Sequence, residues 1–111
     1  MVDVNVNFQV FCTRPGWAIS NPNPKFTDTR YRIYVDDNLI TERSWIWGNN
    51  IALHEDLFVK IDLQTEHTLR LDPITYSDNQ AQFEMHYLRS TDREFVVVKA
   101  ITPLNILFRI A

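Results

Sequence analysis

Cysteine and glycine are scarce in this chain of 111 residues, which has one cysteine and two glycines. The single cysteine, Cys12, excludes a disulfide within the chain and a zinc site made of several cysteines. With so few glycines, most tight turns have to use Asp, Asn, Ser and Pro. No run approaches the ~18 apolar residues that a membrane-spanning helix needs. The composition is otherwise that of a globular domain, 45% hydrophobic and 23% charged.

An excess of positive charge is also lacking. Lys and Arg together number 11 against 14 Asp and Glu, which gives a net charge of −3. This balance does not favour capture of nucleic acid or of an anionic membrane, so we expect neither as a partner. The first residues, MVDVNVNFQV, lack the basic and continuously apolar regions of a secretion signal. We therefore expect synthesis in a cytoplasm.

What the sequence does have is a hydrophobic period of two residues. Alternation of apolar and polar residues, or a run of β-branched residues, marks about eight segments, at 2–10, 30–35, 39–47, 56–63, 68–71, 82–87, 95–101 and 106–110. No segment holds a helical period, and the nearest candidate, 50–58, offers one helical turn before its strand. We expect one all-β domain over residues 1–111, an antiparallel β-sandwich of jelly-roll type with about eight strands.

The same alternation predicts turns and the core. Asp36-Asp37-Asn38 interrupts residues 29–47, and Asp and Asn tolerate the positive φ of a tight turn, so this stretch is expected to be one hairpin. Pro73 is expected to end its strand because it cannot donate to a ladder. The residues expected in the core share one parity within each strand, and they are Val4, Val6, Phe8, Ile33, Val35, Val59, Ile61, Leu69, Leu71, Phe83, Met85 and Val97.

One connection is long for a small sandwich. Residues 13–27, TRPGWAISNPNPKFT, contain three prolines. Two interpretations remain open, a crossover between two sheets or an arm that lies on a neighbouring subunit.

Candidate metal ligands and catalytic groups are few and scattered. His54, His67 and His86 do not have the spacing of a metal site, although His67 shares the inward parity of its strand. The two aspartates at 36–38 could offer oxygens to calcium, but the turn already accounts for them. Cys12 has inward parity, which favours a small core residue over a nucleophile. We expect no catalytic residue, no bound metal and no cofactor.

The tryptophans are the most informative candidates for binding. Trp45 and Trp47 are two residues apart in an expected strand and so share one face. They are either core residues, a platform for stacking a sugar, or the centre of a protein interface. Trp17 in the long connection and Tyr76 in a loop could join either kind of site.

Arginine supplies a second set of candidates. Arg30, Arg32 and Tyr34 share one face of a strand, as in some binders of single-stranded nucleic acid, but the chain's acidic balance favours a solvated or partner-contacting face. Arginine outnumbers lysine eight to three, and arginine is favoured at protein interfaces. Leu107 lies opposite the inward face of the last strand. We therefore expect Arg30, Arg32 and Leu107 to contact a partner chain, in a homo-oligomer or with other subunits.

Two stretches, DTRYRIYVDDNLITERSWIWGNN and EDLFVKIDLQTEHTLRLD, carry a resemblance. Over residues 28–72 the chain resembles small uncharacterised structural proteins of tailed phages, especially phages of marine cyanobacteria. The resemblance implies an all-β virion building block, either a capsid decoration or part of a tail or fibre, assembled in the host cytoplasm. No catalytic residue belongs to these stretches, so the implied role is non-catalytic binding of other virion subunits.

The same span is more weakly similar to jelly-roll carbohydrate-binding modules, in which a Tyr-x-Val-Asp-Gly hairpin recurs. This chain has Asp37-Asn38 where glycine is common there, and it lacks a secretion signal. The alternative function is therefore glycan binding through surface aromatics, and the third is an enzyme without a recognised motif. The aromatics of the alternative are Trp17, Trp45, Trp47 and Tyr76.

Overall fold

The computed structural model describes residues 1–13, 29–45, 52–75 and 82–111. These residues form eight strands and no helix: Val2–Thr13 (β1), Thr29–Val35 (β2), Asn38–Ser44 (β3), Ala52–Ile61 (β4), Glu66–Thr75 (β5), Gln82–Arg89 (β6), Phe95–Thr102 (β7) and Asn105–Ile110 (β8). The expected all-β class and number of strands are confirmed. The helical turn considered at 50–58 is wrong for residues 52–58, which belong to β4.

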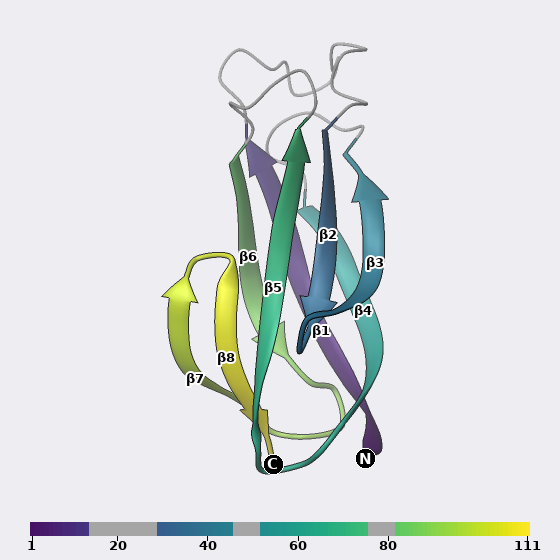
Figure 1. Cartoon of the computed structure of the whole chain (residues 1–111), viewed down its shortest axis with the longest axis vertical. Helices are drawn as coiled ribbons and strands as arrows, with labels where there is room; N and C mark the ends of the chain where they lie inside the picture. Colours follow the sequence, from purple (N-terminus) through teal and green to yellow (C-terminus); the bar gives the residue numbers. More distant parts are fainter. Residues whose placement is uncertain (14–28, 46–51, 76–81) are drawn as a thin grey trace.

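The strands form two antiparallel sheets that pack face to face (Figure 1). The smaller sheet has the strand order β4-β1-β6, and the larger sheet has the order β3-β2-β5-β8-β7. The antiparallel sandwich is therefore confirmed, with a three-plus-five division that the sequence did not predict. β1 and β2 lie in different sheets, as a crossover requires, although residues 14–28 of the connection lie outside the described residues.

The core lies between the sheets and is formed by alternate residues of their strands. All the expected core residues are buried except Val97, which is 47% exposed. Val97 does face inward, because it pairs with the fully buried Phe108 of β8. β7 is, however, the outermost strand of the larger sheet, and the smaller sheet does not cover it. The parity of Val97 was predicted correctly and its burial was not.

The predicted hairpin is present, with its turn at Asp36 and Asp37. Both residues have positive φ, 50° and 64°, and Val35 pairs with Asn38 across the turn. Positive φ at both central residues defines the type I′ turn, whose twist matches that of the two strands. Gln64, with φ of 63°, serves the turn between β4 and β5.

Pro73 does not end its strand, contrary to expectation, because β5 continues to Thr75 and Pro73 pairs with Tyr31 of β2. The reason lies on the other side of β5. The Leu71 amide donates to the Leu104 carbonyl at 2.9 Å. Two residues further on, the Pro73 nitrogen faces the same side, past the residues of β5 that pair with β8. No ladder hydrogen bond is needed from it there, so proline is tolerated.

Candidate functional site

Trp45, a sequence candidate for surface binding, is fully buried. Its ring packs edge-on against Phe83, with 6.1 Å between the ring centroids, and Phe83 packs in turn against Tyr31 at 5.5 Å. Trp45 is therefore a core residue, and it is not available to stack a sugar or anchor a partner. The other aromatic candidates, Trp17, Trp47 and Tyr76, lie outside the described residues.

The arginine candidates lie on the outer face of the larger sheet. Arg32 Nε is 2.7 Å from the Glu42 carboxylate on β3, and Arg30 is half-buried. On the same face the guanidinium of Arg70 lies 4.2 Å from the centroid of the Tyr34 ring. Arg32 and Arg70 on this face thus contact an acidic side chain and an aromatic ring. They do not form the concentrated basic surface that nucleic-acid binding requires.

A carboxylate lies inside the sandwich, because Glu55 of β4 has no exposed surface. The Tyr31 hydroxyl donates to Glu55 Oε1 at 2.8 Å, and Arg43 donates through Nε to Oε1 at 2.8 Å and through Nη2 to Oε2 at 3.3 Å. Burial and the hydrogen bond to Glu55 raise the pKa of Tyr31, and the hydrogen bond to Glu55 raises the pKa of Arg43. The network joins β4 of the smaller sheet to β2 and β3 of the larger one. The sequence offers one signal for it, an acidic residue at an inward position.

His67 makes the contacts that come nearest to a catalytic arrangement. Its Nδ1 lies 2.5 Å from Asp36 Oδ2, and its Nε2 lies 2.9 Å from Thr65 Oγ1, the order of groups in a hydrolase triad. The Nε2 atom is also 2.7 Å from the carbonyl oxygen of Asp62, to which the Thr65 hydroxyl donates as well, at 3.1 Å. A carbonyl oxygen accepts hydrogen bonds and donates none, so Nε2 carries the hydrogen and cannot take a proton from Thr65. The cluster fastens two turns together and does not activate a nucleophile.

The remaining titratable candidates are inert or separated. Cys12 is buried, as its parity predicts, and burial raises the pKa of its thiol to about 12. His54 and His86 are exposed on different strands of the smaller sheet. Among the described residues no group of three or more His, Cys, Asp or Glu could hold a metal ion. Within the same part of the chain, no helix has the length and apolarity to cross a membrane.

A pocket of about 270 Å³ opens on the outer face of the smaller sheet. Strand pairing sets polar residues in rows across this face, with Gln9 of β1 between His54 of β4 and His86 of β6. Arg89 Nε donates to Asn7 Oδ1 at 2.8 Å, which fixes the guanidinium. We call this site the Tyr87 pocket, and its lining residues are Asn7, Phe8, Gln9, His54, Tyr87 and Arg89.

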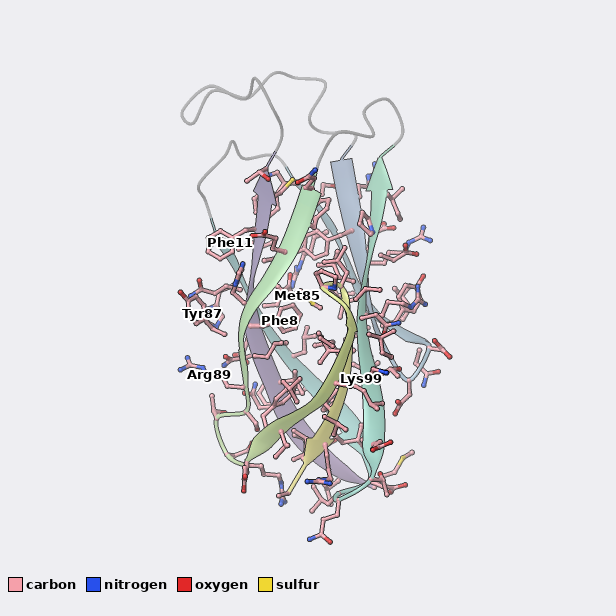
Figure 2. The ribbon with its side chains drawn as sticks, turned by 90° about the vertical axis from the view of Figure 1, so that its left-hand side faces the viewer. Phe8, Phe11, Met85, Tyr87, Arg89 and Lys99 are labelled. Carbon is pink, nitrogen blue, oxygen red and sulfur yellow. The ribbon has the colours of Figure 1, made fainter. Side chains whose placement is uncertain are left out.

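Tyr87 reaches the pocket because β6 carries a bulge. β6 has one residue more than β1 between their paired positions on either side of the bulge, and Tyr87 there has φ of 59°. Unbroken alternation after Met85 would place Tyr87 inward, but Tyr87 is 71% exposed and Leu88 packs against the core instead. Figure 2 shows Tyr87 and Arg89 projecting away from the sandwich. Two consecutive bulky residues in an alternating strand were the available signal.

β7 presents a second kind of surface. Three apolar side chains along it are exposed, Val97 by 47%, Val98 by 39% and Ile101 by 51%, and we call them the β7 apolar strip. Among the strands that the structure describes, β7 pairs with β8 alone, and Figure 1 shows it at the side of the larger sheet with none of these strands beyond it. Lys99, the one charged residue of β7, pairs with Leu107 of β8, which is half-buried.

Comparisons of the chain with models of known protein families, with curated protein sequences and with solved structures find no match. What the protein does must therefore follow from its own residues and surfaces.

Proposed function

We propose that this chain is a non-catalytic structural subunit of a virion, assembled in the host cytoplasm, where it binds other protein subunits through the β7 apolar strip. The observation that carries the proposal is the exposure of Val97, Val98 and Ile101 on an edge strand. The resemblance of residues 28–72 to structural proteins of tailed phages supports the virion setting. A role in capsid decoration and a role in a tail or fibre both fit a small sandwich of this kind.

The β7 apolar strip supports assembly because its exposure is unfavourable in an isolated chain. Burial of apolar surface is the main driving force of protein association. A free edge strand rich in β-branched residues also invites unwanted pairing with other chains. A partner that covered the strip would remove both problems, and a stable contact would bury ~800 Å² on each side.

The backbone of β7 favours side-chain packing over strand addition. Its pairing with β8 shifts register between Val97 and Lys99 and again between Ala100 and Thr102. Bulges and an edge lysine are devices by which native sheets discourage edge-to-edge growth. We therefore expect a closed assembly, in which partner side chains pack on the strip, and not an open-ended fibre.

The buried titratable groups support a non-catalytic role. Glu55 is enclosed with donors on both carboxylate oxygens, and Cys12 is a buried thiol with a raised pKa. His67 donates to a backbone carbonyl through the nitrogen that a triad base would use.

The net charge of −3 gives no support to nucleic acid or an anionic membrane as a partner.

The test is light scattering of the full chain from micromolar to submillimolar concentration, alone and with the particle proteins. Val97→Lys is the test variant, and Leu39→Lys is its matched control. Leu39 is 55% exposed on β3, the opposite edge of the larger sheet. Wild type and Leu39→Lys should assemble or bind particles, whereas Val97→Lys should remain a folded monomer that does not bind.

Two results would contradict the proposal. One is a wild-type chain that stays monomeric at 13.1 kDa and also fails to bind particles that lack it. The other is a loss of assembly in Leu39→Lys that equals the loss in Val97→Lys, because the strip would then have no special part in the contact.

A further inference from the structure

We propose that the Tyr87 pocket binds a neutral saccharide, with one sugar ring stacked on Tyr87 and its hydroxyls paired with Gln9, His54 and Arg89. This site lies on the smaller sheet and is independent of the β7 apolar strip on the larger one. It also differs from the aromatic set that the sequence suggested, of which Trp45 is buried. A virion subunit with such a site would recognise a surface glycan as well as its neighbouring subunits.

Tyr87 is presented to solvent at a conformational cost. Its φ of 59° lies in the left-handed region, which is unfavourable for a bulky side chain. Packing does little to offset this, because the side chain is 71% exposed and its ring contact is with the exposed His86, 6.0 Å between centroids. Bulges that re-aim a side chain occur next to functional sites. The exposed face of an aromatic ring is electron-rich, and the C–H groups on one face of a sugar ring pack well against it.

The polar groups around the ring are suited to hydroxyls. The side chains of Gln9 and His54 make no hydrogen bond within the part of the chain that the structure describes, so both side chains can donate to and accept from a ligand. The Nε of Arg89 is engaged by Asn7 at 2.8 Å, which orients the guanidinium while its terminal amino groups stay available. The pocket volume of about 270 Å³ lies just under the ~300–1,000 Å³ of drug-sized sites and suits one small polar ring.

The charges near the pocket argue for a neutral ligand. The strand pairing that aligns Arg89 with Asn7 also aligns Asp56 in the same row, so the cation has an anion across the face. A second acidic group is near, because Glu84 Oε2 lies 3.1 Å from His86 Nε2 on the same strand. With a net charge of −3 for the whole chain, phosphate groups and nucleic acid would be repelled more than attracted. An uncharged polyol fits this balance best.

The variant Tyr87→Gly separates binding from folding. Glycine adopts positive φ without penalty, so this change removes the ring while it keeps the bulge and leaves the melting temperature unchanged or higher. Gln9→Ala removes a polar contact. Phe58→Ala is the matched control, because Phe58 is 73% exposed on the same face of the smaller sheet but does not line the pocket.

The probe is a glycan array of neutral and acidic oligosaccharides, followed by calorimetric titration of the full chain with the neutral sugar that binds. We expect retention of neutral glycans by wild type and Phe58→Ala, and a loss of affinity of at least about tenfold in Tyr87→Gly and Gln9→Ala. The proposal is overturned if no neutral glycan is retained, if only acidic glycans are retained, or if Tyr87→Gly binds like wild type. It is also overturned if Tyr87→Gly loses binding to particle proteins while no glycan binds, because the pocket would then be a protein contact.

Discussion

Tyr87 shows how much one inserted residue changes a strand. Its sequence position continues the alternation of Phe83 and Met85, both of which are buried. The bulge shifts the phase of β6 by one residue, so Tyr87 turns out to solvent and Leu88 turns in. A bulge depends on how two strands pair, so the two consecutive bulky residues Tyr87 and Leu88 could only hint at it.

Replacing Tyr87 with glycine is expected to stabilise the fold. A left-handed conformation costs an L-residue roughly 1–2 kcal/mol, and glycine avoids that cost. Loss of the contact with His86 and the larger conformational entropy that glycine loses on folding offset part of the gain, so we expect a net increase of at most about 1 kcal/mol in the free energy of unfolding. Urea denaturation measures it. Leu39→Gly, at an exposed strand position without positive φ, should instead lower stability, and a loss in both variants would show that Tyr87 is not strained.

The buried thiol of Cys12 is expected to make the folded state less stable as the pH rises into the alkaline range. Burial raises the pKa of its thiol to about 12, from an ordinary value of 9.0. The unfolded chain therefore loses this proton at a lower pH than the folded chain does. The stability contributed by Cys12 is present in full below about pH 9 and falls as the pH rises towards 12.

Urea denaturation at about pH 8 and about pH 10.5 measures this fall. The variant Cys12→Ala should lose less stability between the two pH values than wild type. Part of the fall should persist in the variant, because burial also raises the pKa of Tyr31. An identical fall in both proteins would mean that the Cys12 thiol does not contribute.

Among the strands, the hydrogen bonds of Glu55 with Tyr31 and Arg43 form a buried polar link between the two sheets. Arg43→Met would leave this buried carboxylate with the Tyr31 hydroxyl alone, and we expect the free energy of unfolding to fall by about 2–3 kcal/mol. Arg32→Met is the matched control, because Arg32 meets Glu42 at a similar distance on an exposed face. Exposed pairs contribute little, so equal losses in the two variants would contradict the structural role of this link.

Features that depend on a residue's own conformational preferences were predictable from the sequence. Features that depend on which strands lie beside it were not. Asp36 and Asp37 supply the positive φ of their turn by themselves, so the hairpin follows from its own residues. The tolerance of Pro73 depends on the place where its pairing with β8 ends, and the exposure of Val97 depends on the width of the opposite sheet. Neither can be deduced from the strand that carries the residue.

The candidate sites follow the same division. From the sequence, Trp45 could lie either in the core or on the surface. The structure places it in the core, where its ring packs against Phe83. The Tyr87 pocket draws on three strands, and its lining residues are Asn7, Phe8 and Gln9 on β1, His54 on β4, and Tyr87 and Arg89 on β6. Such sites require the strand order and register, which no motif in this sequence encodes.

In the whole molecule, the two proposed binding surfaces lie on different sheets. The β7 apolar strip is suited to hold the protein in an assembly, and the Tyr87 pocket is suited to hold a small polar ligand. Figure 1 shows β7 at the edge of one sheet, and Figure 2 shows Tyr87 projecting from the other. A subunit docked through β7 could therefore keep the outer face of its smaller sheet free for a ligand.

Amide hydrogen exchange across β7 tests whether the protein assembles through the β7 apolar strip. Exchange is compared between the dilute chain and the chain that is concentrated or mixed with particle proteins. We expect added protection in Phe95–Thr102 and unchanged exchange in Asn38–Ser44, the opposite edge of the same sheet. Unchanged exchange in β7 on assembly, or protection confined to β3, would contradict this expectation.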